Sequence, residues 1–201
     1  MRKWLVPLVI IAVLVLLGIS SYNGLVSVEA DTKTAWSKVE SSYQRRNDLI
    51  GNLVKTVQGA ADFEKGTLTA VIEARAKATS VTVDPANITP EQLAQFQQAQ
   101  SGLTSSLSRL LVTVEQYPDL KVNQNFLELQ SQLEGTENRI NVERDRFNDA
   151  ANIYDKKTRS FPSVIFAKLF GFKEIARFKS EAGAEKAPDV EFNFDKKEET
   201  K

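Results

Sequence analysis

The sequence predicts an all-α protein, with an N-terminal transmembrane helix followed by an antiparallel bundle of three to four long helices. Three observations predict this fold class. Residues 4–28 carry no charge and are mainly apolar. Beyond them, apolar residues recur at helical spacing in three blocks, and the sequence lacks the alternation typical of strands. The blocks are separated by segments that contain proline.

The composition narrows the range of functions. The chain of 201 residues is long enough for one domain with a stable core, and its 26 basic and 26 acidic residues leave no net charge. A nucleic-acid partner is not expected, because phosphate binding needs a basic surface. The sequence contains no cysteine and no histidine. This excludes disulfides, thiolate metal sites and cysteine nucleophiles, and it removes the commonest general base and metal ligand.

The uncharged run predicts a membrane anchor over residues 1–28. A bilayer core of about 30 Å needs roughly 20 apolar residues in a helix, and this run has 25. A cleaved signal peptide is the alternative, with Gly18 and Ser20 at the cleavage site. That site lacks the preferred alanines, and the uncharged run continues well past it. The anchor is therefore predicted to be retained.

Charges that flank the anchor predict its orientation. Arg2 and Lys3 precede the anchor, and Glu29 is the first charged residue after it. The positive-inside rule favours a cytoplasmic N-terminus, with the rest of the chain outside the cytoplasm. Lys33 and Lys38 weaken this asymmetry.

Three blocks of apolar residues predict the helices of a bundle domain over residues 29–180. Within each block, apolar positions recur every seven residues or alternate by three and four, which keeps one stripe towards a partner helix. These positions are Trp36, Tyr43, Ile50 and Val57 in the first block, Leu93, Phe96, Leu103, Leu107, Leu110 and Val114 in the second, and Phe126, Leu133, Ile140, Phe147 and Tyr154 in the third.

Capping residues and prolines predict where the second and third helices begin. Thr89 stands before a proline and predicts an N-cap followed by the first helical residue. Pro118 predicts a turn, because it disfavours a helical conformation at the residue before it. The third helix follows over about residues 122–158, with Asn123 or Asn125 available to cap it.

Glycines predict two further features. The first helix, over about residues 29–80, is expected to break near Gly59 or Gly66, which would give four antiparallel segments. Gly135 lies inside the third helix, where glycine costs about 1 kcal/mol relative to alanine. We expect Gly135 to allow a close approach of the first helix near residues 43–46.

Polar residues on the apolar stripes predict structural roles. Arg46 and Gln100 interrupt apolar rows, as single polar residues do when they set the register of coiled coils; a ligand site is the alternative. The second half of the chain is rich in acidic residues: Glu115, Glu128, Glu134, Glu137, Glu143 and Asp145. A di-iron site in a helical bundle would need Glu-x-x-His pairs, and this chain has no histidine. The acidic residues are therefore predicted to form a solvated face, with an all-carboxylate metal site as the alternative. We expect no catalytic, cofactor-binding or metal-binding residues.

Residues 161–178 admit two main interpretations. Five phenylalanines alternate there with lysine and arginine. In the first interpretation the segment turns back at Pro162 and closes one end of the bundle, which would bury Phe166, Leu169 and Phe170. In the second it lies on a lipid surface as a basic amphipathic segment; a partner-binding patch is a third. The helical spacing of its apolar residues favours packing.

Several long motifs, in order, resemble the LemA family. They are "AWSKVESSYQRRNDLIGNLVKTVQGAADFE" (35–64), "EARAKA" (73–78), "LSRLLVTVEQYPDLKVNQNFLELQSQLEGTENRI" (107–140) and "RFNDAANIYDKKTRSFPSVIFAKLFGF" (146–172). The resemblance implies a membrane anchor followed by an antiparallel helical bundle in a bacterial envelope, without a known enzyme activity or cofactor. Family members usually carry proline where Gly51 stands here.

Together, the residues and the resemblance predict a membrane-anchored, non-enzymatic protein of the bacterial cell envelope that acts through protein–protein interaction as an adaptor or in assembly. The alternatives are an envelope sensor that binds a small ligand within the bundle, and a structural protein associated with the membrane surface. Its expected partners are the membrane and other envelope proteins, without nucleic acid or a small-molecule substrate. It is expected in the plasma (inner) membrane, crossing it once. Residues 181–201 are charged and are predicted to be disordered.

Overall fold

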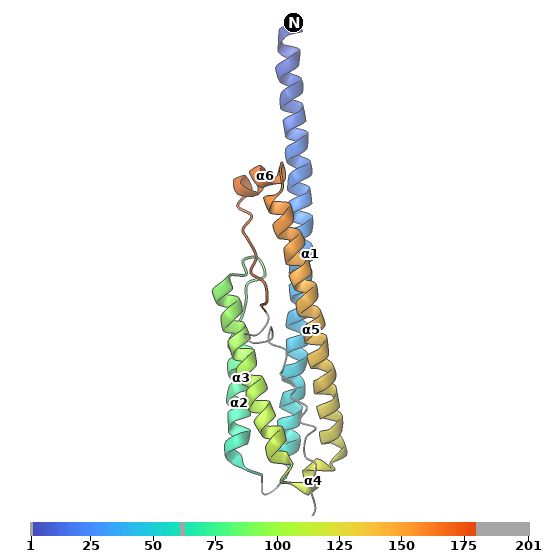
Figure 1. Ribbon diagram of the computed structural model, residues 1–201, viewed down its shortest axis with the longest axis vertical. Helices are drawn as coiled ribbons and strands as arrows, with labels where there is room; N and C mark the ends of the chain where they lie inside the picture. Colours follow the sequence, from blue (N-terminus) through green and yellow to red (C-terminus); the bar gives the residue numbers. More distant parts are fainter. Residues whose placement is uncertain (1, 61–62, 180–201) are drawn as a thin grey trace, which may run out of the picture.

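The computed structural model describes residues 2–60 and 63–179, which form six helices and no strand. The helices are α1 (Arg2–Gln58), α2 (Lys65–Ser80), α3 (Pro90–Val114), α4 (Pro118–Lys121), α5 (Gln124–Arg159) and α6 (Ser163–Phe170). Four of them, α1, α2, α3 and α5, run side by side in alternating directions as a bundle (Figure 1). The predicted all-α bundle is confirmed. The tail at 181–201 lies outside the described residues.

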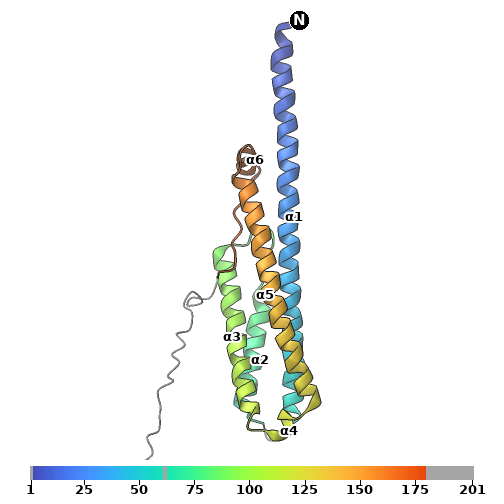
Figure 2. The same cartoon turned by 45° about the vertical axis from the view of Figure 1, so that its right-hand side comes forward.

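α1 is a single helix of 57 residues that joins the N-terminal apolar run to the bundle. Its first part projects well beyond the other helices (Figure 2). The apolar side chains there, from Val6 to Leu17, are exposed. In the part of the chain that the structure describes, α1 alone is long and apolar enough to cross a membrane. These features place the chain among membrane-associated helical proteins.

The helix boundaries follow the predicted signals. α1 ends at Gln58, next to Gly59, and α2 begins at Lys65, so the expected break exists and the bundle has four segments. The Thr89 side chain accepts a hydrogen bond from the backbone N–H of Gln92 as part of a capping box at α3. Asn123 caps α5 by accepting from the N–H of Phe126 at 3.2 Å.

The bundle core is built on the predicted heptad positions. α1 packs mainly on α5, and α2 packs mainly on α3. At the end of the bundle nearer the apolar run, Trp36 is fully buried among aromatic rings, with its centroid 5.2 Å from Phe147, 5.7 Å from Phe96 and 5.9 Å from Phe178. Ile140, in the middle of the α5 stripe, is also buried. The burial of these side chains supplies most of the stabilisation of the fold.

Residues 172–179 run in an extended conformation along the bundle and contribute to its core. Ile175 and Phe178 are buried. The side chain of Asn148 holds the backbone of Phe178 through both polar groups, at 2.9 Å to the N–H and 3.0 Å to the carbonyl. The Ala176 N–H donates to the Ile88 carbonyl at 3.0 Å. For this half of the C-terminal segment, the packing interpretation is correct.

For α6 the predicted burial is wrong. Leu169 and Phe170 are 72% and 52% exposed, and Phe166 is half-buried. The reason is local: Gly171 has a φ of 78°, ends α6 in the left-handed conformation and turns the chain back along the bundle. The apolar residues before and after Gly171 therefore do not share one helical stripe.

The role predicted for Gly135 is also wrong. Gly135 is exposed, and a Cβ added there would meet no atom within 4 Å. The Gly135→Ala variant is therefore expected to raise the free energy of unfolding by about 0.4–1 kcal/mol, since alanine reduces the entropy of the unfolded chain and favours the helix. Denaturant unfolding of the full chain in detergent measures this. A destabilised Gly135→Ala variant would contradict the exposed position.

α1 continues through Gly51 without a break. The Arg75 Nε donates to the Asn47 carbonyl at 2.8 Å. In an α-helix this carbonyl is the acceptor for the N–H of residue 51. A Cβ at position 51 would stand 3.2 Å from the Arg75 guanidinium, so the glycine leaves room for this side chain against α1. With glycine at this position, α1 has no proline kink here.

Candidate functional site

The candidate site is a groove along the seam between α3 and α5. These two helices border each other but make few backbone contacts, because α1 pairs with α5 and α2 pairs with α3. Three adjoining hollows lie along the seam and share lining residues such as Gln97, Thr104 and Lys179. We name the three together the seam groove, with an upper, a middle and a lower part, the upper part lying nearer the N-terminal apolar run.

The upper part borders the extended segment 174–179. Its walls are the start of α3, including Leu93, and the α5 residues Asn148 and Asn152. Asn148 binds the backbone of Phe178, and the Phe178 ring packs on Trp36 beneath. The seam groove thus already binds one extended peptide segment, through backbone hydrogen bonds and an aromatic anchor.

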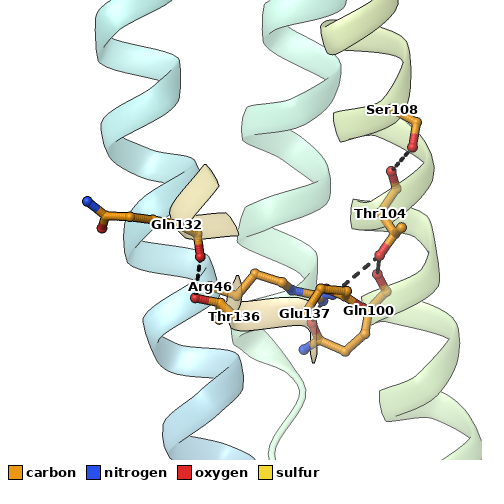
Figure 3. A network of polar contacts seen from close by, with 7 residues as sticks. All are labelled: Arg46, Gln100, Thr104, Ser108, Gln132, Thr136 and Glu137. Carbon is orange, nitrogen blue, oxygen red and sulfur yellow. Dashed lines mark hydrogen bonds and ion pairs between the residues drawn. The ribbon is translucent and has the colours of Figure 1, made fainter. Parts of the chain in front are cut away.

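The middle part is a polar hollow of about 550 Å³ with the buried Arg46 of α1 at its base. Only 3% of Arg46 is exposed. Its Nη2 donates to the Gln100 Oε1 at 2.5 Å, and its Nη1 contacts a Glu137 carboxylate oxygen at 3.0 Å and the Thr104 Oγ1 at 3.3 Å (Figure 3). The Arg46 Nε is buried without a hydrogen-bond partner among the described residues.

The two polar residues that interrupt the apolar stripes therefore bind each other. Gln100 also donates from its Nε2 to the Ala78 carbonyl of α2 at 3.3 Å. Through Arg46, Gln100 and Glu137, hydrogen bonds join α1, α2, α3 and α5 at one level. A shift of any one helix along its axis would leave a buried charge or amide unpaired, so this network fixes the register.

The lower part is a smaller apolar pocket of about 140 Å³ next to Arg46. Its apolar walls are Ile50, Leu107, Leu111 and Leu133. An apolar protein cavity of about 150 Å³ is large enough for benzene. The lower part therefore has the size and character to receive one aliphatic or aromatic side chain.

Cations line the middle part, and the phenol group of Tyr43, which also lines it, remains protonated. The Arg144 guanidinium lies 4.7 Å from the centroid of the Phe178 ring, and the Arg46 guanidinium lies 5.0 Å from the Tyr43 ring. Burial raises the pKa of Tyr43, while Arg144 and Arg46 act in the opposite direction. Lys179 adds a third cation at the rim. This arrangement suits hydrogen bonding and the binding of anionic groups.

Two further ionisable groups hold the extended segment. The Tyr154 hydroxyl donates to the Lys173 carbonyl at 2.8 Å, and burial raises the pKa of Tyr154 to about 12. Burial also raises the pKa of Asp155, although this carboxylate accepts a hydrogen bond from the Ile175 N–H and lies 3.6 Å from Arg177. Both side chains bind the backbone of the extended segment.

The acidic residues singled out in the sequence are dispersed. Glu115, Glu128, Glu134 and Asp145 are exposed. Glu137 pairs with Arg46, and Glu143 is buried beside Arg146, with an O–N distance of 2.8 Å. Over residues 2–60 and 63–179, the structure places no three acidic side chains together as metal ligands.

One feature of the sequence does point to the seam groove: a row of small polar residues in α3, beside the more prominent apolar stripe. The lining residues contributed by α3 include a stripe of small polar side chains at helical spacing: Ser101, Thr104, Ser105 and Ser108. Such side chains are too short to fill the space between two helices. A small-residue stripe beside an apolar one therefore indicated an open seam.

Comparisons with known proteins agree with this architecture. The sequence model of the LemA family matches residues 35–192, which include the whole seam groove. The magnetosome protein MamQ 2 of Paramagnetospirillum magneticum is 28% identical over 174 residues, covering 78% of this chain and 64% of the relative. MamQ of Magnetospirillum gryphiswaldense is 27% identical over the same length and coverage. Protein LemA of Metamycoplasma hominis is 23% identical over 158 residues, covering 79% of this chain and 68% of that protein. The chain spans about 64% of the length of the MamQ relatives.

Proposed function

Because the chain belongs to the LemA family and carries an N-terminal helix able to cross a membrane, we propose that it is a membrane-anchored adaptor that binds other envelope proteins through the seam groove. One observation supports this most directly. The extended segment 174–179 packs between α3 and α5 and forms one wall of the upper part, while all three parts of the groove remain open among the described residues. The hydrogen bonds from Asn148 to the Phe178 backbone show that side chains beside the groove can bind an extended peptide segment.

The groove defines the chemistry of the partner. In the middle part, where the Arg46 charge is already paired with Glu137, Arg144 and Lys179 attract acidic groups, and the serine and threonine hydroxyls supply further hydrogen bonds. The lower pocket accepts one apolar side chain, and Glu134 at its rim disfavours additional acidic residues there. The matching partner is a protein segment with an aliphatic or aromatic anchor for the lower pocket and an acidic residue for the middle part.

The proposed location is the plasma (inner) membrane of a bacterium, crossed once, with the bundle on the outer face. Arg2 and Lys3 before the apolar run support this orientation. The role requires no catalytic group, which suits a chain without histidine or cysteine. Two relatives are magnetosome proteins by name, and an adaptor role would suit family members that belong to a defined cellular structure.

A photo-crosslinking amino acid at Ser108, on the seam groove, tests the proposal in cells. We expect this position to form a crosslink to a discrete partner protein. The same amino acid at Thr69, an exposed position on α2 away from the groove, should not. A Ser108→Trp variant fills the groove and is expected to weaken partner binding at least about tenfold, the equivalent of 1.4 kcal/mol.

The matched control is Thr69→Trp, which adds an aromatic side chain outside the groove and should leave partner binding unchanged. Equal crosslinking at both positions, or undiminished binding by a folded Ser108→Trp chain, would reject the groove as the binding surface. Crosslinking to no protein, together with a small molecule that copurifies and is displaced by Ser108→Trp, would instead favour the sensor alternative.

A further inference from the structure

α6 presents an apolar face that no described part of the protein covers. Phe161, just before the helix, is 82% exposed, and Ile165 within it is 56% exposed. Leu169 and Phe170 are exposed as well. Soluble proteins rarely leave so many large apolar side chains together on one short helix, and such a surface marks a site of contact with another molecule or a membrane.

The position of α6 identifies what covers it. α6 lies beside α1 above the bundle, in both views (Figures 1 and 2). A Cβ on Gly18 would stand 3.1 Å from the Phe166 ring, so the glycine allows this close packing. The rings of Tyr22 and Phe170 meet edge to face at 4.9 Å. Both α1 contacts belong to the uncharged run of residues 4–28.

The depth of these contacts can be read along α1. Gly18 follows Lys3 by 15 residues, which is about 22 Å at 1.5 Å per residue. A bilayer hydrocarbon core is about 30 Å thick. With the charges of Arg2 and Lys3 at one membrane surface, Gly18 therefore lies within the hydrocarbon region, and Tyr22 lies near the opposite surface. The apolar face of α6 is continuous with the lipid-facing surface of α1.

Basic residues lie next to α1 just beyond Gly18 and Tyr22, on the side nearer the bundle. The Lys157 side chain lies against Gly24 of α1, one to two turns farther from the N-terminus. Lys156 is exposed next to it in the sequence, Lys168 is an exposed residue of α6 itself, and Arg159 pairs with Glu174 at 2.5 Å. Lysines at the height where a transmembrane helix leaves the hydrocarbon core suit anionic headgroups, while the apolar side chains reach deeper.

We propose that α6 is a second membrane element: its apolar face, from Phe161 to Phe170, enters the acyl-chain region of the leaflet on the bundle side, packed against α1. Lys157 and its basic neighbours then lie at the lipid headgroups. Both α1 and α6 then contact the leaflet on the bundle side, and the two contacts together fix the tilt of the bundle relative to the bilayer.

Fluorescence quenching in lipid vesicles tests this directly, because the native sequence has no cysteine. The full chain with Leu169→Cys is labelled with NBD and reconstituted in phosphatidylcholine–phosphatidylglycerol vesicles that contain lipids brominated on the acyl chains. The control is Val112→Cys at the far end of α3, which is 70% exposed against 72% for Leu169. We expect brominated lipid to quench the label at position 169 several-fold more than at 112, and aqueous iodide to show the reverse order.

A second pair, Ile165→Cys on α6 and Val142→Cys on α5 as its control, shows whether the result depends on one substitution. We expect brominated lipid to quench the label more at position 165 than at 142, and iodide to quench it less. Equal iodide quenching within each pair would overturn the proposal, because α6 would then lie in water. Protection of positions 165 and 169 from both quenchers would also overturn it, since protein rather than lipid would then cover α6.

Discussion

Removal of residues 161–201 should lower the free energy of unfolding by about 3–6 kcal/mol, because Ile175 and Phe178 each contribute roughly 1.5–3 kcal/mol by burial. The truncated chain also leaves the Trp36 ring uncovered on its Phe178 side and deprives Asn148 of both backbone partners. Denaturant unfolding of the full and the truncated chain, in the same detergent and followed by far-UV circular dichroism, measures the difference.

Point variants separate the two halves of this segment. Phe178→Ala in the full chain should reproduce a large share of the loss, since truncation of a buried phenylalanine typically costs about 3–5 kcal/mol. Leu169→Ala in detergent should change the free energy of unfolding by less than about 0.5 kcal/mol, because Leu169 is exposed. A chain that ends at Ser160 and remains as stable as the full chain would show that the extended segment does not belong to the core.

Trp36→Ala should destabilise the protein by about 3–5 kcal/mol, the usual cost of truncating a buried aromatic residue to alanine. Trp36 is fully buried and lies at the centre of a cluster of rings from α1, α3, α5 and the C-terminal segment. The resulting cavity would remove contacts between elements that are distant in the sequence. The loss is measured as a lowered denaturant midpoint with an unchanged slope.

Trp36→Phe provides the matched control. Phenylalanine keeps an aromatic ring at the position and removes the indole N–H, which is buried without a hydrogen-bond partner among the described residues. We expect a cost clearly below that of Trp36→Ala. If both variants unfold at the midpoint of the native chain, the ring cluster is not a source of stability.

The bundle could be predicted from the sequence because its signals are local. Heptad positions such as Ile140 alternate with polar residues, and Thr89 and Asn123 stand where free backbone N–H groups need acceptors. These patterns depend on the helix alone, so they do not require knowledge of the neighbouring elements.

The seam groove and the exposed face of α6 depend instead on how elements meet. Arg46 and Gln100 each appeared as separate polar interruptions, and only the bundle brings them within hydrogen-bond distance of each other. The spacing of apolar residues around α6 suggested one buried stripe, but Gly171 ends the helix and divides that stripe. A glycine inside a helix suggests the close approach of another backbone, but Gly135 lies on the exposed face of α5, which the sequence around it does not reveal.

Because α1 is one continuous helix, it holds the seam groove at a fixed distance from the N-terminal apolar run. Arg46, at the base of the seam groove, follows Val28 by 18 residues of continuous helix, so the middle part stands about 27 Å beyond the end of the apolar run at 1.5 Å per residue. If the apolar run crosses the membrane as proposed, no loop separates it from the bundle, so the groove cannot move towards or away from the bilayer by bending at a linker. In that arrangement, a membrane protein could bind the proposed groove only with a segment that extends about that far from the bilayer, and a protein with only short loops could not reach it.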